Sequence, residues 1–124
     1  MKTLVIDDSR AVRLIIRDIL REMGSEAIEA GDGREGLERL REDPDIELVL
    51  VDWNMPVMSG LEFVRAVRAD RDFDAVRIMM VTTETETDQV IRAFEAGADE
   101  YVMKPFTREI LVAKINLLDA FREP

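Results

Sequence analysis

Carboxylates, a hydroxyl and an amine follow four of the short apolar runs in this sequence. In chain order these residues are Asp7, Asp8, Asp52, Thr82 and Lys104. An aspartate carboxylate can act as a nucleophile and form an aspartyl phosphate. An ammonium group or a hydroxyl can offset the charge on phosphoryl oxygens. If these side chains meet in space, they predict phosphoryl transfer to a carboxylate.

Three carboxylates at one site would repel one another. Two carboxylates ~4 Å apart repel by about 4 kcal/mol at an effective dielectric of ~20, and a single lysine leaves the group net negative. A bound divalent cation would relieve this repulsion. Because every available ligand is oxygen, the set suits Mg²⁺, with Mn²⁺ as a substitute, rather than zinc.

Asp52 is the best candidate nucleophile of the three aspartates, because it ends the strand expected at the centre of the sheet and would lie beside the cation. The Thr82 hydroxyl could donate a hydrogen bond to one phosphoryl oxygen. The backbone N–H groups of Trp53 and Asn54 could supply further donors. Lys104 would balance the remaining charge.

The elements that must position these residues alternate along the chain between apolar runs and segments of helical period. Strands are expected at residues 4–6, 26–30, 46–51, 78–81 and 101–103. Helices are expected at residues 9–23 and 33–42, from the capping box Ser59-x-x-Glu62, at residues 86–96, and from Thr107 to about Phe121. This alternation predicts one α/β domain over residues 1–124, a three-layer (βα)5 sandwich with a five-stranded parallel sheet.

The quality of the strand runs indicates their order. The first, third and fourth runs are continuously apolar, as expected for strands covered on both faces, while the second and fifth are half-polar, as expected for edges. The order 2-1-3-4-5 satisfies this pattern. Ligands then bind at the carboxyl ends of the strands near the switch point, between Asp7-Asp8 and Asp52.

Two helices carry apolar faces whose roles differ. The first helix has one broad face, expected to pack inward: Val12, Ile15, Ile16, Ile19, Leu20 and Met23. The last helix is apolar over more than one face: Ile110, Leu111, Ile115, Leu117, Leu118 and Phe121. One of its faces must pack on the sheet, and the remainder is a candidate partner surface.

Composition excludes several classes of function. The chain has no cysteine and no histidine, so disulfides, thiolate zinc sites and histidine catalysis are excluded. A net charge of −10 argues against direct nucleic-acid binding. The N-terminal apolar run is too short to insert in a membrane, so a cytoplasmic protein is expected.

At these residues the sequence resembles the receiver domain of two-component response regulators. The resemblance covers the whole chain and rests on four motifs in order: Asp7-Asp8, the segment from Asp52 to Gly60, Val81-Thr82-Thr83-Glu84, and the segment from Tyr101 to Phe106. Trp53-Asn54, Glu84 and Tyr101 make it most similar to the single-domain chemotaxis regulators of that family. The fold implied is flavodoxin-like.

The resemblance implies a role for each residue. Asp52 would accept a phosphoryl group from a sensor histidine kinase or phosphotransfer protein. Mg²⁺ would be held by Asp8, Asp52 and the Asn54 carbonyl, with Asp7 acting through a bound water. Thr82 and Tyr101 would couple phosphorylation to a surface formed by the fourth helix, fifth strand and fifth helix, which would contact a downstream protein. Such a protein is not a turnover enzyme, although it catalyses its own phosphorylation and dephosphorylation. A monomer is expected, with dimerisation through that surface on phosphorylation as the alternative.

Three further residues are placed by the resemblance where the family tunes the lifetime of the acyl phosphate: Asn54, Thr83 and Glu84. Thr83 departs from the family pattern, because many members carry Ala or Gly there. Its larger side chain would narrow the access of water, which affects the lifetime and leaves the chemistry unchanged.

Other interpretations of these motifs remain open from the sequence. Asp7-Asp8 could simply cap the first helix. An aspartate-nucleophile phosphohydrolase would place Asp-x-Asp after the first strand, where this chain has adjacent aspartates. A flavodoxin-like cofactor domain would need a phosphate-binding loop there. A receiver that acts through protein contact without phosphorylation is the closest rival.

Overall fold

The computed structural model describes the backbone of residues 1–122 and the side chains of residues 1–118. Five strands alternate with five α-helices over this range, which confirms the predicted fold class. The elements are β1 (Lys2–Ile6), α1 (Arg10–Glu22), β2 (Glu26–Ala30), α2 (Gly33–Glu42), β3 (Ile46–Val51), α3 (Gly60–Arg68), η1 (Arg71–Phe73), β4 (Arg77–Thr82), α4 (Thr87–Ala96), β5 (Glu100–Met103) and α5 (Arg108–Arg122).

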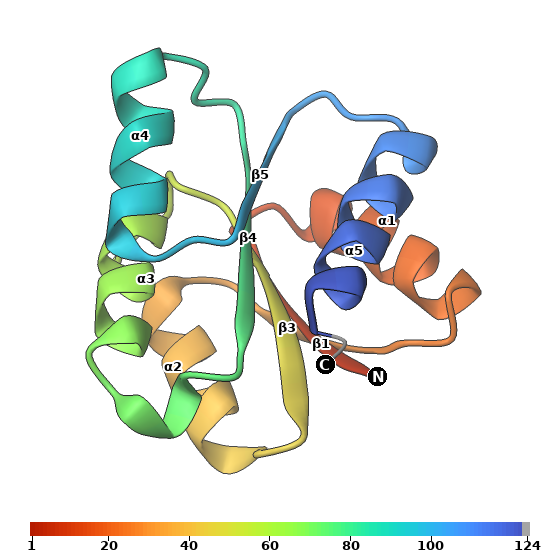
Figure 1. Ribbon diagram of the computed structural model, residues 1–124. Coiled ribbons are helices and arrows are strands. Elements are labelled where there is room, and N and C mark those ends of the chain that lie inside the picture. Colours follow the sequence, from red (N-terminus) through yellow and green to blue (C-terminus); the bar gives the residue numbers. More distant parts are fainter. Residues whose placement is uncertain (123–124) are drawn as a thin grey trace.

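All five strands are parallel and lie in the order β2-β1-β3-β4-β5. The half-polar strands β2 and β5 therefore form the edges, as predicted. Helices α2, α3 and α4 cover one face of the sheet and α1 and α5 cover the other, which gives three layers (Figure 1). The switch point lies between β1 and β3, whose carboxyl ends carry the predicted carboxylates.

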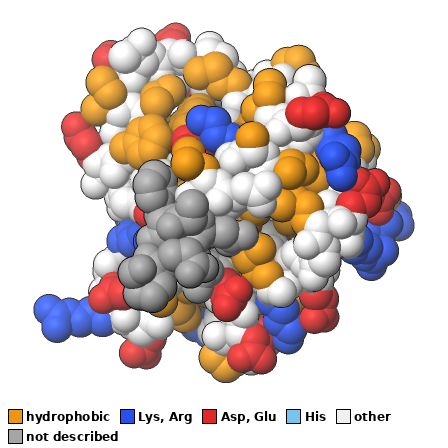
Figure 2. Space-filling model, turned by 45° about the vertical axis from the view of Figure 1, so that its right-hand side comes forward, with side chains coloured by type: hydrophobic (Ala, Val, Ile, Leu, Met, Phe, Trp, Pro, Cys, Tyr) orange, Lys and Arg blue, Asp and Glu red, His pale blue; other side chains and the backbone are white. Residues whose placement is uncertain are grey.

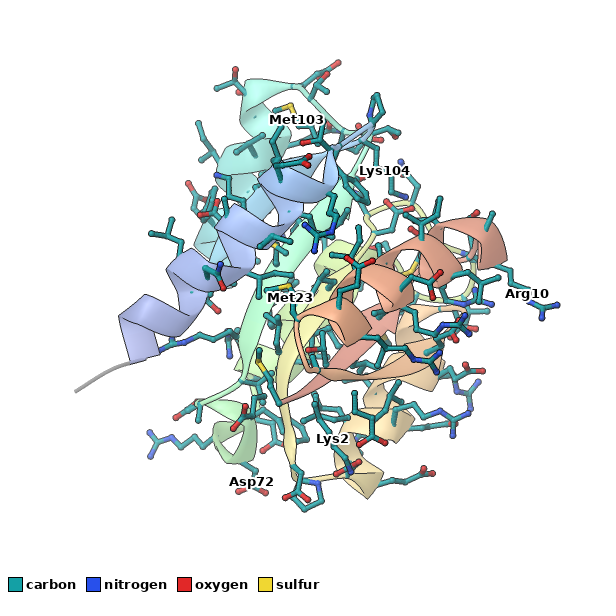
Figure 3. The ribbon with its side chains drawn as sticks, turned by 90° about the vertical axis from the view of Figure 1, so that its right-hand side faces the viewer. Lys2, Arg10, Met23, Asp72, Met103 and Lys104 are labelled. Atoms are coloured by element: carbon teal, nitrogen blue, oxygen red, sulfur yellow. The ribbon has the colours of Figure 1, made fainter. Side chains whose placement is uncertain are left out.

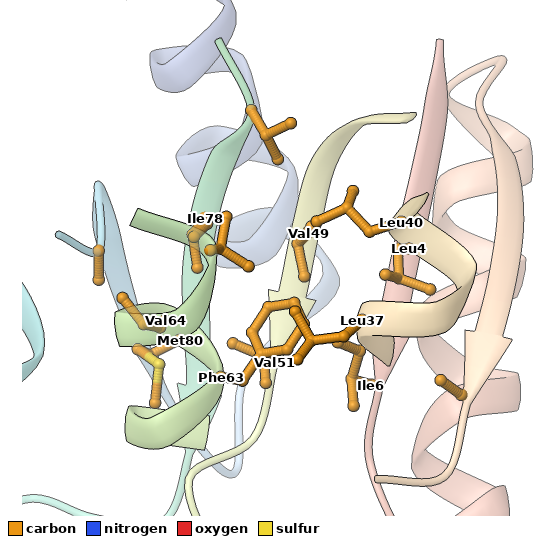
Figure 4. Packing of buried hydrophobic residues seen from close by; sticks show 14 of the residues in the cluster. Leu4, Ile6, Leu37, Leu40, Val49, Val51, Phe63, Val64, Ile78 and Met80 are labelled. Carbon is orange, nitrogen blue, oxygen red and sulfur yellow. The ribbon is translucent and has the colours of Figure 1, made fainter. Parts of the chain in front are cut away.

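The central strands send alternate side chains to two separate cores. On β4, Ile78 and Met80 face the core under α2, α3 and α4, while Met79 and Val81 face the core under α1 and α5. All four are at most 2 % exposed. Phe63 of α3 fills the centre of the first core, beside β3 (Figure 4). Burial on both faces explains why these strands read as continuous apolar runs.

Side-chain caps begin most of the helices where the sequence predicted. The hydroxyl of Ser9 accepts a hydrogen bond from the Val12 amide, so Ser9, and not Asp7 or Asp8, caps α1. Ser59 and Glu62 form the predicted reciprocal capping box of α3. The 3-10 turn η1 was not predicted, because three residues are too few to show a hydrophobic period.

The structure corrects the predicted inner face of α1. Ile15 was expected to pack inward and is 55 % exposed, whereas Ile16 is 1 % exposed. Ile15 lies at the margin of the apolar stripe and faces the turn at Pro105 and Phe106, where it lines a shallow apolar cavity instead of the sheet. A residue at the edge of a stripe can be buried or exposed depending on how the helix is tilted.

The last helix has two apolar faces, as predicted. Leu111, Ile115 and Leu118 are buried against the sheet, while Ile110 and Leu117 are 50 % and 44 % exposed. The side chain of Phe121 lies outside the described residues. Along residues 1–122, no helix combines the length and apolar content that crossing a bilayer requires.

Candidate functional site

The sheet itself brings the predicted site residues together, because their backbone amides extend its hydrogen-bonding pattern beyond the strand ends. Each amide donates to the carbonyl of the last residue of a neighbouring strand. The pairs are Asp7 to the carbonyl of Ala30 (3.1 Å), Asp52 to Ile6 (3.0 Å) and Lys104 to Thr82 (2.9 Å). Together with the pairing of β3 and β4, these bonds fix the carboxyl ends of β1, β3, β4 and β5 at one edge of the sheet.

Lys104 is the cation at the centre of this edge. Its ammonium donates to Oδ2 of Asp7 at 2.6 Å and approaches Oδ2 of Asp52 at 3.3 Å. The peptide bond between Lys104 and Pro105 is cis. Figure 3 shows Lys104 at the end of the sheet opposite to Lys2. One lysine therefore bridges the ends of the first and third strands.

Asp7, Asp8 and Asp52 form the acidic cluster. One carboxylate oxygen from each lies within 4.8 Å of the others. At that separation two carboxylates repel by about 3.5 kcal/mol at an effective dielectric of ~20, and Lys104 balances only one of the three charges. Three carboxylates with all-oxygen donors suit a hard divalent cation, so this cluster could hold a metal ion.

The three carboxylates differ in their own contacts. Asp7 is 2 % exposed and uses both oxygens: Oδ2 accepts from Lys104, and Oδ1 accepts from the Ser9 amide at 2.9 Å. Asp52 is 8 % exposed, and its Oδ1 accepts from the Trp53 amide at 2.7 Å. Asp8 is exposed, and its carboxylate has no hydrogen-bond partner within the described part of the chain. Asp8 is therefore the carboxylate most available to a cation.

Gly60 allows α3 to begin close to the backbone of Asp52. Its amide donates to the Trp53 carbonyl at 2.9 Å. A Cβ atom at this position would overlap the carbonyl oxygen of Asp52. The absence of a side chain at residue 60 thus lets the loop after β3 fold tightly beneath the candidate nucleophile.

The charged groups of the site alter one another's protonation. Burial raises the pKa of the Asp7 carboxyl, although the hydrogen bond from Lys104 opposes this change. Burial alone would lower the pKa of the Lys104 ammonium. The hydrogen bond and charge of Asp7, together with the charge of Asp52, outweigh that effect and raise the pKa of Lys104 above its ordinary value. Lys104 therefore stays protonated, as a group that neutralises phosphoryl charge must.

Glu84 links the two predicted switch residues through its backbone. Its amide donates to Oγ1 of Thr82 at 3.4 Å, and its carbonyl accepts from the hydroxyl of Tyr101 at 2.7 Å. Thr82 is fully buried and Tyr101 is 7 % exposed. Tyr101 thus points inward, and a displacement of the Glu84 backbone would alter the contacts of both side chains.

The other predicted residues lie at the rim of the site. The side-chain amide of Asn54 donates to Oε1 of Glu84, which joins the loop after β3 to the loop after β4. Thr83 is exposed and borders the same apolar cavity as Lys104 and Ile15.

The predicted partner surface is apolar within an acidic molecule. Ile91 and Phe94 of α4, Met103 of β5 and Ile110 of α5 are each 43–50 % exposed. The Phe94 ring lies 6.5 Å from the Tyr101 ring, so this surface touches the switch residue directly. Figure 2, with α1 and α5 turned forward, shows exposed hydrophobic side chains among the charged ones.

The structure also reveals contacts at the site that sequence reasoning missed. The Ser9 amide holds one oxygen of Asp7, and the guanidinium of Arg13 donates to the main-chain carbonyl of Asp7. The serine could have been found from its place directly after the two aspartates. The arginine gave no signal, because on the sequence it is one basic residue on a helix that carries four arginines.

Known proteins are similar to this chain in sequence and in fold. The model of the response regulator receiver domain matches residues 3–116. The chemotaxis protein CheY1 of Helicobacter pylori is 43 % identical over 119 residues, which cover 95 % of this chain and 96 % of that protein.

Two solved structures extend the comparison. The chemotaxis response regulator CheY4 of Vibrio cholerae has a TM-score of 0.88 and 35 % identity over 94 % of this chain and 97 % of its own. A probable two-component system response regulator/GGDEF domain protein has a TM-score of 0.92 and 31 % identity, and the match covers 99 % of this chain and 51 % of the larger one.

Proposed function

This chain belongs to the response regulator receiver domain family, and from that membership we propose that Asp52 is its phosphoryl acceptor. The family and the CheY relatives make the chain a phosphorylation-based signalling module, not a classical enzyme. The observation that carries the assignment of Asp52 is the position of the Lys104 ammonium, 3.3 Å from Asp52 and 2.6 Å from Asp7. The receiver unit is proposed to span residues 1–124.

In the proposed reaction, a carboxylate oxygen of Asp52 attacks the phosphorus of a phosphohistidine on a sensor kinase or phosphotransfer protein. The P–N bond breaks, and its electron pair returns to the imidazole nitrogen of the donor. The Lys104 ammonium and the Trp53 amide lie against Asp52 and can hold the charge of the transferred group. Thr82 uses its oxygen as an acceptor from Glu84, which leaves its hydroxyl proton free to donate to a phosphoryl oxygen.

Mg²⁺ is the proposed cation, with Mn²⁺ as a substitute. The fit rests on the oxygen-only cluster and on Asp8, whose carboxylate is exposed and makes no hydrogen bond within residues 1–118. Asp8, Asp52 and the Asn54 carbonyl would hold the ion, with Asp7 in the surrounding shell. When bound, the ion would neutralise charge on the carboxylates and the phosphoryl oxygens.

We propose that the signal leaves the site through the backbone of Glu84. If the Thr82 hydroxyl turns toward a phosphoryl group, its oxygen no longer lies in place for the Glu84 amide. The backbone of Glu84 then shifts, and the Tyr101 hydroxyl that donates to its carbonyl shifts with it. Because Phe94 packs near Tyr101, the change reaches the exposed apolar surface on α4, β5 and α5, where a downstream protein would bind.

The proposed lifetime of the acyl phosphate depends on the rim of the site. The hydrogen bond between Asn54 and Glu84 closes one side of the entrance, and Thr83 stands at another. Self-dephosphorylation requires water to reach the phosphorus past these groups. The setting proposed for the whole cycle is the cytoplasm, with the protein a monomer before phosphorylation and dimerisation through the surface on α4, β5 and α5 as the alternative.

The experiment uses Trp53, the only tryptophan, as the reporter. Its fluorescence is followed while Mg²⁺ and then beryllofluoride, a phosphoryl mimic, are added, and intact-mass analysis follows treatment with acetyl phosphate. We expect an Mg²⁺-dependent, saturable change and one added phosphoryl group. D52N should abolish the response to the mimic and the mass increase, while D45N, an exposed aspartate at the opposite end of the sheet, should retain both. A folded wild-type protein with no response in either assay would favour a receiver that works by contact alone.

A further inference from the structure

Asp7 is held by four hydrogen bonds, and one of them fixes the direction of its main-chain carbonyl. The amide donates to Ala30, and the two carboxylate oxygens accept from Ser9 and Lys104. The carbonyl accepts from a terminal nitrogen of the Arg13 guanidinium. This last contact comes from a side chain of α1, six residues further along the chain, and no part of the proposed reaction uses it.

Arg13 is itself held from the other side. Its Nε donates to Oε1 of Glu29 at 3.1 Å, and the two side chains are 17 % and 31 % exposed. Glu29 lies on β2, the edge strand beside β1. A guanidinium can make both contacts at once because its donors lie in a rigid plane. Arg13 therefore ties the loop after β1 to the edge of the sheet.

The carbonyl of Asp7 belongs to the peptide bond that leads to Asp8. Because a peptide unit is planar, the direction of this carbonyl sets the position of the Asp8 amide and Cα atom. The carboxylate of Asp8 has no hydrogen bond of its own among residues 1–118. The direction of the Asp7 carbonyl is thus one of the few restraints on where Asp8 can present its oxygens.

From this geometry we infer that Arg13 is a positioning residue for the cation site, which acts by holding the Asp7–Asp8 peptide so that Asp8 faces Asp52. The inference rests on the proposed binding of Mg²⁺. Groups that orient metal ligands without touching the ion typically contribute roughly 10–100-fold to metal affinity. Glu29 contributes to this positioning because its carboxylate holds the Arg13 guanidinium in place.

Charge and positioning predict opposite effects when Arg13 is replaced. Arg13 carries a positive charge near a cation site, so removing that charge alone would tighten the binding of Mg²⁺. Removing the positioning contact would weaken it. Methionine has a side chain of similar length and no charge. Its substitution for Arg13 therefore distinguishes the two explanations by whether the affinity for Mg²⁺ rises or falls.

The test measures Mg²⁺ affinity by Trp53 fluorescence in the wild-type protein, R13M, R13K and the matched control R17M. Arg17 lies one turn further along α1 and pairs with Asp18 on the surface. We expect R13M to bind Mg²⁺ about tenfold more weakly than the wild type, R13K to bind several-fold more weakly although its charge is kept, and R17M to match the wild type.

Thermal unfolding of each variant in EDTA shows whether its fold is intact. If R13M is not folded, the same comparison is made with R13K alone. Affinity equal to or tighter than the wild type, in whichever folded variant is measured, would overturn the inference and leave the proposed function standing. A folded wild-type protein that does not bind Mg²⁺ would instead defeat the proposed function.

Discussion

Val57 should be replaceable by glycine with a gain in stability. It lies in the loop between β3 and α3 with φ of +69°, the only non-glycine residue with positive φ among residues 1–122. The Met58 amide donates to the Pro56 carbonyl across it at 2.7 Å, which closes a three-residue turn. A β-branched residue is strained in this conformation, at a cost on the order of 1–3 kcal/mol.

The net gain follows from three contributions. Glycine relieves strain of about 2 kcal/mol. It loses about 0.7 kcal/mol because the unfolded chain becomes more flexible. Val57 is 73 % exposed, so losing its side chain removes only a quarter of the value of a buried valine, about 0.4 kcal/mol. V57G should therefore be more stable than the wild type by about 1 kcal/mol.

Urea unfolding in EDTA measures this difference directly, and thermal unfolding should show a rise of about 3–5 °C for a domain of this size. V57A is the control, because it loses the same contacts and keeps the Cβ atom that causes the strain. At an unstrained site glycine is the less stable of the two by about 0.4–1 kcal/mol. If V57G is no more stable than V57A, the turn is not strained and the reasoning is wrong.

Three further outcomes are expected from the site and its supports. K104M should bind Mg²⁺ more tightly in a fluorescence titration, because the acidic cluster loses the charge of Lys104 that balances it. The same variant should bind beryllofluoride more weakly, because the ammonium no longer neutralises the phosphoryl mimic. Unchanged affinity for both ligands would contradict the proposed role of Lys104. Burial, with the charges of Glu84 and Asp52, raises the pKa of Tyr101 to about 12. Because this is the only tyrosine, absorbance should show phenolate forming near pH 12 in the folded protein. The free energy of unfolding should fall as the pH rises from about 10 through about 12, since the unfolded chain releases the phenol proton first. Ionisation near pH 10 in the folded state would show that Tyr101 faces solvent. S59A should lower the free energy of unfolding by about 1 kcal/mol in urea, because the first turn of α3 loses its cap. The control T85A, at an exposed residue that caps no helix in the described chain, should have little effect.

Much of the fold could be predicted from local signals. Helix caps and the pattern of apolar residues in a strand involve only residues a few positions apart in the sequence. The bounds of α2 and β3 were therefore predicted to the residue. The convergence of Asp7, Asp52 and Lys104 followed from one rule, that parallel strands end at the same edge. These predictions needed no knowledge of how any two elements pack.

The features that were missed depend on such packing. Ile15 lies beside Pro105 and Phe106 and is 55 % exposed, which depends on how α1 packs against a segment 90 positions away. Arg13 contacts the Asp7 carbonyl and Glu29 at the same time, and the second contact depends on β2 lying beside β1. The hydrogen bond from Asn54 to Glu84 joins two loops 30 positions apart. A sequence pattern predicts which face of a helix or strand a residue occupies, but it does not predict which residue of another element it contacts.

The bridge between Lys104 and Asp7 also constrains when the site can come into existence. The two residues are 97 positions apart, and closing a flexible loop of that length directly would cost about 4 kcal/mol of chain entropy. The contact must therefore await the pairing of the strands between them, which bring its ends together in smaller steps. During synthesis Asp52 emerges from the ribosome with β3, long before its ammonium partner. We therefore expect a nascent chain to lack the complete site until β5 has joined the sheet and brought Lys104 beside Asp7 and Asp52.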